Sequence, residues 1–364
     1  MFRLVLLAAA ACVALPAAAQ GGWQSCVALA DSERLACFDR WAQQAAPPAL
    51  PAPANAPARA AAVAAVPAET ASLPSAGGCH DRRYSDLSRF WELEAGSDCG
   101  TFGIRGYRPI SLSAVKADSI NNQPVSGNPA NNPDTAQSYG TTETRLQLSV
   151  RTKLFQNLLT RANPAISDSL WFGYTQQSYW QVFNGTISRP FRSTDHEPEV
   201  IYVYPSDYTL PAGWRLRYTG LGVVHQSNGQ PLPLSRSWNR IYLMAGAEHG
   251  NAWRLQARIW KRIPEDIDSD DNPGISDLVG RGELAASWSP NRQNMLNATL
   301  RHSLSHSGRG SVRLEWLRAL GDDARGAPAG MRLHTQLFTG YGDSLLDYNY
   351  RRTVFSIGLS LVDW

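Results

Sequence analysis

Short segments with alternating polar and apolar side chains recur from about Thr101 to the C-terminus, separated by turn-rich stretches. Successive side chains of a β-strand point to opposite faces, so this alternation predicts strands with one apolar face. Alternating segments of about this length are typical of transmembrane β-barrels. We expect twelve strands, near residues 102–115, 143–156, 168–183, 196–208, 213–226, 235–248, 251–263, 277–289, 293–304, 309–319, 330–341 and 351–363. The predicted fold is all-β: a twelve-stranded antiparallel transmembrane β-barrel with a disordered N-terminal extension.

The connections between these segments alternate between short and long. Residues 248–251 and 289–292 are short turns, whereas the longer and more polar connections are 116–142, 184–195, 227–234, 264–276 and 342–350. Bacterial barrels have short periplasmic turns and long extracellular loops. With an even number of strands both termini lie at one end, so we expect periplasmic termini and an extracellular position for the long loops.

A soluble all-β sandwich or barrel also has many short strands, and alternation alone does not exclude it. Two features favour the membrane barrel: the alternating loop lengths, and an aromatic C-terminus, Trp364, after the apolar positions of 355–361. Only 18% of the residues are charged, and 12 Trp and 13 Tyr suit the aromatic girdles of a barrel. Beyond the N-terminus, no apolar run is long enough for a transmembrane helix, so a membrane-spanning form must be a barrel.

The N-terminal region divides into four parts before the barrel domain at 101–364. Residues 1–19 form a predicted signal peptide, with Arg3, an apolar run and a small-residue cleavage site at 17–19. Cys12 lies too early in the apolar run for a lipoprotein signal. We expect a small Cys-bracketed segment at 20–41, an extended Ala/Pro-rich linker at 42–78, and a periplasmic arm at 79–100.

Four cysteines remain after removal of the signal peptide, and all precede the predicted strands: Cys26, Cys37, Cys79 and Cys99. An even number in an exported chain indicates disulfides, whose pairing the sequence leaves open, although Cys26–Cys37 and Cys79–Cys99 are the closest-spaced pairs. Metal binding is less favoured, because the spacings match no zinc pattern. The formal net charge of +3, without a concentrated basic run, gives no reason to expect nucleic-acid binding.

The strongest chemical signal lies where one predicted strand ends and the next begins. Ser227 is a candidate nucleophile, and His225, two residues earlier, projects from the same strand face as a candidate general base. A hairpin brings Asn239 beside His225, where its amide oxygen can accept the Nδ1 proton. Asn239 orients the ring without supplying a full charge, so this site needs a further source of charge stabilisation.

The parity of these residues predicts which way they face. His225 continues the apolar positions Leu221 and Val223, and Asn239 shares its parity with Ile241 and Leu243. In a membrane barrel the apolar face meets lipid, so the site is expected on the outer surface. Each residue alone has an ordinary structural interpretation, since a His near a Ser is common in strands and Asn-Gly is a turn signal. The catalytic hypothesis depends on the residues taken together.

The composite motif resembles outer membrane phospholipase A, a family of bacterial twelve-stranded barrel enzymes. The pattern is His225-x-Ser227-Asn228-Gly229 followed by Ser235-Arg236-Ser237-Trp238-Asn239-Arg240. Further matching stretches are 174–181, 190–194 with 197–198, 270–273 and 340–349, so the resemblance covers about 101–364. It implies a Ser227–His225–Asn239 triad and a catalytic Ca²⁺ that is completed only in a homodimer.

The resemblance also implies the calcium ligands. These are the hydroxyl of Ser235, the backbone carbonyl of Gln230 and the carbonyl of Ser188 from the other subunit, while Gln176 matches a polar residue of the dimer interface. Leu232 departs from the family pattern, because an Asp can assist calcium there. We expect the pair Asp270-Asp271 to be a solvated turn more than a metal site.

The function expected from the resemblance is calcium-dependent hydrolysis of glycerophospholipid acyl esters at the outer leaflet of the bacterial outer membrane. The expected activities are phospholipase A1, phospholipase A2 and lysophospholipase, with activation by dimerisation. A non-enzymatic barrel and an esterase acting on another lipid are the alternatives. The presence of Ser227, His225 and Asn239 at the matching spacing argues against the first.

Overall fold

A computed structural model describes residues 26–27, 29–45, 77–163, 165–322 and 330–361. The chain divides into two units, Met1–Thr70 and Ala71–Trp364. In the first unit, helix α1 spans Asp31–Ala45 and a disulfide joins Cys26 to Cys37. The predicted signal peptide, most of the Ala/Pro-rich linker and the C-terminal Trp364 lie outside the described residues. Among the described residues, no helix combines the length and the apolar character needed to cross a membrane.

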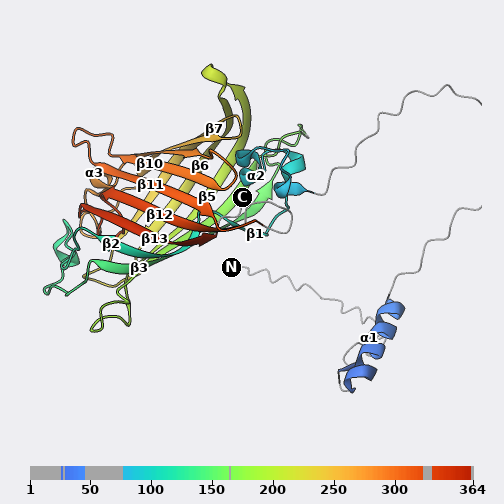
Figure 1. The fold of residues 1–364 in the computed structure, drawn as a ribbon, viewed down its shortest axis with the longest axis horizontal. Helices are drawn as coiled ribbons and strands as arrows, with labels where there is room; N and C mark the ends of the chain where they lie inside the picture. The colour runs from blue at the N-terminus through green and yellow to red at the C-terminus, as the bar shows by residue number, and fades with distance from the viewer. Residues whose placement is uncertain (1–25, 28, 46–76, 164, 323–329, 362–364) are drawn as a thin grey trace, which may run out of the picture. The chain divides into compact units, whose positions relative to one another are not determined.

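The second unit is a closed antiparallel barrel of twelve strands, β2 to β13, with a short additional strand, β1 (Figure 1). Each of the twelve barrel strands pairs with its sequence neighbour, and β13 pairs with β2 to close the barrel, while β1 pairs with β3. The strands are β1 Ile104–Gly106, β2 Ile110–Ala117, β3 Thr142–Gln156, β4 Ser169–Trp180, β5 Phe191–Thr209, β6 Arg215–Ser227, β7 Ser237–His249, β8 Trp253–Arg262, β9 Gly282–Trp288, β10 Asn294–His302, β11 Gly310–Ala319, β12 Met331–Gly340 and β13 Arg352–Leu361. The predicted fold class is confirmed.

Several of the predicted strands differ in their limits. The strand expected at 277–289 begins only at Gly282. The segment expected at 102–115 is divided into β1 and β2, which pair with successive parts of β3. Pro109 lies in the interruption and has no N–H to donate to a ladder. β5 begins at Phe191 and not at residue 196, because Arg192 and Asp195 turn inward and are buried there. Their burial extends the strand into the region expected to be a loop.

The outer face of the barrel is apolar and the inner face is polar. On β7, Ile241 and Leu243 are 42% and 56% exposed, whereas Arg240 and Tyr242 between them are 7% and 4% exposed. This is the reverse of a soluble barrel, whose apolar side chains fill the interior. The arrangement therefore suits a barrel surrounded by lipid.

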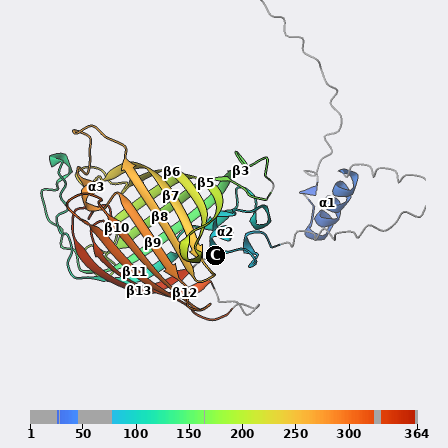
Figure 2. The same ribbon diagram turned by 90° about the horizontal axis from the view of Figure 1, so that it is seen from above.

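The two ends of the barrel differ. Helix α2 (Asp86–Trp91) lies at one end and helix α3 (Ile275–Leu278) at the other, as two perpendicular views show (Figures 1 and 2). The connections at the α3 end are 118–141, 181–190, 228–236, 263–281, 303–309 and 341–351. Two of the turns at the α2 end, 250–252 and 289–293, are much shorter. The connection 157–168, also at the α2 end, is longer than several loops at the α3 end, so the expected alternation of connection lengths holds only in part.

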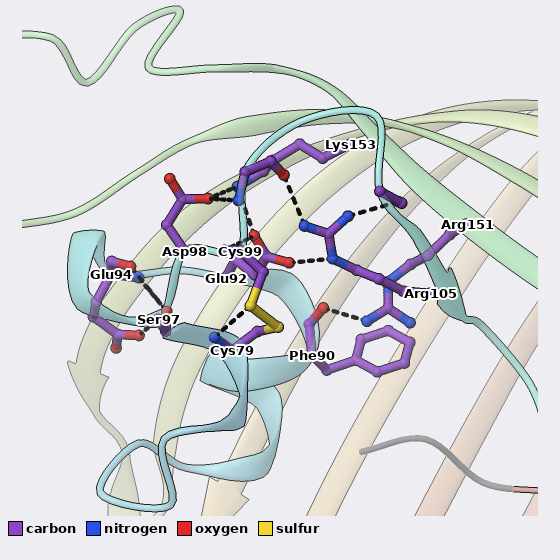
Figure 3. Close-up of a disulfide and its surroundings, with 12 residues drawn as sticks. Cys79, Phe90, Glu92, Glu94, Ser97, Asp98, Cys99, Arg105, Arg151 and Lys153 are labelled. Atoms are coloured by element: carbon purple, nitrogen blue, oxygen red, sulfur yellow. Dashed lines mark hydrogen bonds and ion pairs between the residues drawn. A yellow bond between two sulfur atoms is a disulfide. The ribbon is translucent and has the colours of Figure 1, made fainter. Parts of the chain in front are cut away.

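The arm of residues 77–100 packs into the α2 end of the barrel (Figure 3). Trp91 is fully buried and packs edge-on against Trp171 and Tyr218 of the barrel wall. A disulfide joins Cys79 to Cys99. Lys153 of β3 is buried and forms ion pairs with Glu92 and Asp98 of the arm, at 2.6 and 2.5 Å. The predicted arm is therefore an ordered structure that closes this end of the lumen.

A buried ionic cluster lies beneath the loops at the α3 end. Arg192 pairs with Glu143 at 2.6 Å and with Asp347 at 2.9 Å, and Arg352 pairs with Asp343 at 2.8 Å. Burial raises the pKa of Asp343 and Asp347, but the adjacent arginines outweigh it and hold each pKa below its ordinary value. The ionised carboxylates thus attach the 341–351 loop to the barrel wall.

Candidate active site

The hairpin of β6 and β7 places the three predicted catalytic residues together. His225 is paired with Asn239 across the two strands, and Ser227 with Ser237. His225 Nδ1 lies 2.8 Å from Asn239 Oδ1. Because an amide oxygen only accepts, Nδ1 carries the proton and Nε2 is the free acceptor of the neutral ring. The Asn239 amide nitrogen donates to Glu265 at 3.3 Å, which keeps the amide oxygen turned toward the imidazole.

These residues lie on the outer face of the barrel. His225 is exposed, and it continues a row formed by Leu221 and Val223, which are 43% and 47% exposed. The alternate residues Gly222 and Val224 are buried. The parity expected from the sequence is therefore observed, and an acyl ester in surrounding lipid would reach the site without entering the lumen.

Ser227 follows His225 by two residues, so both side chains leave the same face of β6. In the described part of the chain, the Ser227 hydroxyl makes no hydrogen bond to the imidazole. Residues two apart on a strand have Cβ atoms about 7 Å apart, a separation that rotamer changes can close. Such contacts often tighten only when substrate is bound. The structure thus shows an oriented imidazole beside a hydroxyl that does not contact it.

The loop 228–236 is held rigidly next to Ser227. Asn228 is 3% exposed, and its side-chain oxygen accepts the N–H of Arg236 at 2.9 Å. Gly229 has a φ of 62°, a left-handed conformation that glycine adopts without strain. Arg236 is fully buried and donates to backbone carbonyls of the 118–141 loop. Candidate metal ligands in this loop are therefore held in place by the fold.

The three predicted calcium ligands provide only oxygen donors. Ser235 donates its hydroxyl proton to Asp271 at 2.7 Å, which leaves the oxygen lone pairs free to bind a cation. In the part of the chain that the structure describes, no hydrogen bond ends on the Gln230 carbonyl. The Ser188 carbonyl accepts the Trp180 indole N–H at 2.6 Å and retains one lone pair. Hydroxyl and carbonyl oxygens suit Ca²⁺, so the donor set fits the ion.

The expectation for Asp270-Asp271 as a solvated turn is wrong. Both residues are partly buried, and Asp270 pairs with Arg262 at 2.6 Å. Asp271 accepts hydrogen bonds from Ser235 and Ser237. The loop 263–281 folds back onto the β6–β7 hairpin, a contact that sequence position alone does not reveal.

Residues 87–361 match the phospholipase A1 family. Phospholipase A1 of Escherichia coli (strain K12) is 34% identical over 238 residues, which are 63% of this chain and 73% of that protein. Phospholipase A1 of Salmonella typhimurium is 35% identical over 229 residues, 61% of this chain and 70% of that protein. The chain belongs to the phospholipase A1 family.

Solved structures of phospholipases have the same fold. Outer membrane phospholipase A from Escherichia coli has a TM-score of 0.61 at 31% identity, covering 71% of this chain and 94% of that chain. The Salmonella typhi outer membrane phospholipase, solved as a dimer with bound calcium, has a TM-score of 0.62 at 31% identity, covering 72% and 93%. An active-site mutant of the Escherichia coli enzyme, with an asparagine replaced by alanine, has a TM-score of 0.64 at 29% identity, covering 75% and 97%. As a member of this family, the chain is a phospholipase, an ester hydrolase.

The sequence pattern placed Asp271 in a solvated turn and gave no sign of His196, yet the fold brings both to the site of this phospholipase. Asp271 contacts Ser235 through the long loop before β9. His196 of β5 lies directly opposite Ser227 of β6. A period-two pattern predicts which face a residue occupies but not its register with a neighbouring strand. Neither contact could therefore be found from the spacing of residues along the chain.

Proposed function

We propose that this phospholipase is a calcium-dependent enzyme of the outer membrane that hydrolyses acyl esters of glycerophospholipids and lysophospholipids through Ser227, His225 and Asn239. One observation carries the proposal: the 2.8 Å contact of His225 with Asn239 lies on the apolar outer face, beside Ser227. A base oriented in this way, next to a hydroxyl and exposed to lipid, suits hydrolysis of a substrate that remains in the bilayer. The active-site mutant of the Escherichia coli enzyme, in which an asparagine is replaced, supports a role for Asn239.

The reaction would proceed through an acyl-enzyme. Ser227 Oγ attacks the ester carbonyl carbon while His225 Nε2 takes the hydroxyl proton. The tetrahedral intermediate then breaks its bond to the glycerol oxygen, which leaves with the proton from His225. Water, deprotonated by the same imidazole, attacks the acyl-enzyme and releases the fatty acid and free Ser227. Asn239 holds the proton of the ring on Nδ1 throughout, so that Nε2 remains available to both half-reactions.

A bound Ca²⁺ would stabilise the negative charge on the carbonyl oxygen, which an uncharged Asn239 cannot do from behind the imidazole. Ser235 and Gln230 would hold the ion together with Ser188 of the partner subunit. The Salmonella typhi relative, a dimer with bound calcium, supports both the metal and the assembly. Gln176 on the outer face of β4 would lie at the dimer interface. The shared site would make dimerisation the step that switches on catalysis.

The polarity of the barrel supports the proposed location. An apolar outer face and a polar interior suit a barrel in the outer membrane, with the arm 77–100 at the periplasmic end. The loops at the α3 end would then be extracellular, and Ser227, at the end of β6 nearest these loops, would face the outer leaflet.

A passive pore is a weaker interpretation of this barrel. The arm 77–100 fills one end of the lumen, and the ionic cluster around Arg192 lies across the other. Between them lies a cavity of about 240 Å³ lined by charged side chains such as Arg145 and Glu315. A lumen filled in this way fits a barrel that supports a site on its outer surface better than it fits a channel.

Fatty-acid release from mixed phospholipid–detergent micelles tests the proposal. We expect release by the refolded full chain with Ca²⁺, and a loss of at least about 100-fold with a chelator or in Ser227→Ala. Cross-linking in the same samples would report the dimer. A folded dimer that releases no fatty acid with Ca²⁺ would contradict the proposed function.

A further inference from the structure

A second imidazole lies beside the proposed nucleophile. His196 of β5 is the direct cross-strand partner of Ser227, so the two side chains leave the same, outer face of the barrel. Directly opposed residues have Cβ atoms roughly 5 Å apart, which is closer than the separation of about 7 Å between His225 and Ser227 along one strand. His196 is partly buried and lies on the side of Ser227 away from Asn239.

His196 is the end of a hydrogen-bonded chain across the outer surface of β4 and β5. Its Nδ1 lies 2.8 Å from the Tyr174 hydroxyl, which lies 3.2 Å from the Gln176 amide. The amide contacts Ser178 at 3.3 Å, and Ser178 contacts Thr194 at 3.0 Å. The rings of Tyr174 and His196 are also stacked, with centroids 6.2 Å apart. The chain fixes the orientation of the imidazole.

The chain can run in either direction, because hydroxyls donate and accept and the Gln176 amide can be turned over. As placed, Tyr174 donates to the Gln176 amide oxygen, so Nδ1 of His196 donates to Tyr174. With the Gln176 amide turned over, the bonds run from Thr194 through Ser178 and Gln176 to Tyr174, which then donates to Nδ1, and the ring proton of His196 lies on Nε2. Nε2 faces Gly229, whose added Cβ would lie 3.6 Å from it. In the described part of the chain, this nitrogen has no hydrogen-bond partner. In that arrangement, an oriented N–H donor without a partner lies beside Ser227.

The chemistry of a phospholipid suits this donor. The phosphodiester is a few bonds away from the acyl ester, and it must leave bulk water when the ester lies over Ser227, so it needs a hydrogen-bond donor there. Arg192, Arg236 and Arg240, on the strands and the loop around Ser227, are buried, at 4%, 0% and 7% exposure. Arg192 and Arg240 pair with lumen carboxylates, and Arg236 donates to loop carbonyls. A donor to phosphate from this side must therefore come from the outer surface.

We propose that His196 is a specificity-determining residue that binds a phosphate oxygen of the head group through Nε2–H while the acyl ester lies over Ser227. This inference rests on the proposed function, and it names the part of the substrate that the site recognises. His225 and Asn239 carry out proton transfer on one side of the nucleophile, and His196 selects phosphate-bearing lipids on the other. Gly229 leaves room for the head group, since a side chain there would approach the imidazole.

A binding measurement separates this inference from catalysis. Octylphosphocholine has a phosphodiester but no ester, and 1-O-octylglycerol has the same alkyl chain without phosphate. Calorimetric titration of the full chain in a maltoside detergent should show about tenfold weaker binding of octylphosphocholine to His196→Phe than to wild type, with octylglycerol unaffected. The matched control is His249→Phe, at the opposite end of β7, which should bind both ligands as wild type does.

Kinetics provide the second readout. With lysophosphatidylcholine, His196→Phe should raise KM about tenfold with little change in kcat, whereas a monoacylglycerol with the same chain should be hydrolysed as by wild type. His196→Gln, which places an amide N–H near the position of Nε2, should restore part of the KM. Equal losses on both lipids, or no change in binding or KM, would overturn the role of His196. Binding that depends on His196 in a protein that hydrolyses neither lipid would keep this inference and reject the proposed enzyme.

Discussion

Asn239 differs from the carboxylate found in many serine hydrolase triads because it has no charge. It can hold the His225 tautomer through the 2.8 Å contact, but it cannot stabilise the imidazolium by a full opposite charge. The transition-state stabilisation that Asn239 does not provide has to come from another group. The proposed Ca²⁺ would provide it at the oxyanion. At the scale of single residues, the uncharged Asn239 would therefore depend on the proposed metal for charge stabilisation.

Asn239→Ala should lower kcat by about 10- to 100-fold, because the imidazole keeps its place but loses the acceptor that selects its tautomer. The hydroxyl, the base and the calcium ligands all remain, so activity should not vanish. Initial rates of fatty-acid release from micelles measure the effect, and the heat-dependent gel mobility of the barrel controls for folding. Turnover equal to wild type would remove Asn239 from the proposed triad.

Gly222 occupies a position where a side chain has no room. A Cβ there would lie 2.2 Å from the ring of Tyr242, whose hydroxyl donates to Glu199 at 2.5 Å. Gly222→Ala should therefore lower the free energy of unfolding by about 1–3 kcal/mol. Gly185→Ala, with no atom within 4 Å of the added carbon, is the matched control and should be near neutral. Urea unfolding in detergent compares the two, and equal stability of both variants would contradict the packing described for β6 and β7.

The strands and the face on which each side chain lies could be predicted from the sequence. The register between neighbouring strands could not. Alternation gave twelve strands near their observed places and put His225 on the apolar face, because both depend only on period two. The early start of β5 was missed, since Arg192 resembles a loop residue until its partners Glu143 and Asp347 are known. The pairing of His196 with Ser227 was missed for the same reason: it depends on how two strands are aligned.

The disulfide between Cys79 and Cys99 closes a loop of the arm that fills the α2 end. Replacing both cysteines by serine should destabilise the arm by about 2–4 kcal/mol, because a cross-link limits the conformations of the unfolded segment. The barrel ladders do not depend on it, so the strands should remain folded. Amide hydrogen exchange would show the difference as faster exchange in 79–100 with unchanged protection in β3 to β13. Unchanged exchange in the arm would contradict this prediction and would show that the ion pairs and the packing of Trp91 keep the arm folded without the disulfide.

For the whole molecule, acid should release the arm before it unfolds the barrel. Burial raises the pKa of Asp98, but its hydrogen bond and ion pair with Lys153 and the Gly100 N–H outweigh this and lower the pKa to about 2. A lowered folded-state pKa gives stability that is present above the ordinary value near 4 and is lost as pH falls through the folded-state value. The arm should therefore become sensitive to pepsin between about pH 4 and pH 2.

Asp98→Asn is the matched variant for this pH dependence. It keeps the size of the side chain but removes the titrating group and the charge that pairs with Lys153. Its arm should be cleaved more readily near neutral pH by a broad-specificity protease, and the change in cleavage between pH 4 and pH 2 should be smaller than in wild type. The same pH profile in both proteins would contradict the assigned role of Asp98.

The central claim is that Ser227 is a nucleophile on the lipid-facing surface. Its most direct test is covalent labelling of the detergent-solubilised full chain with Ca²⁺ by a long-chain alkylsulfonyl fluoride, followed by mass analysis of the peptides. We expect one modified peptide, containing Ser227, with no labelling in Ser227→Ala and strongly slowed labelling in His225→Ala. Labelling at another residue, or none in a folded dimer with Ca²⁺, would contradict it.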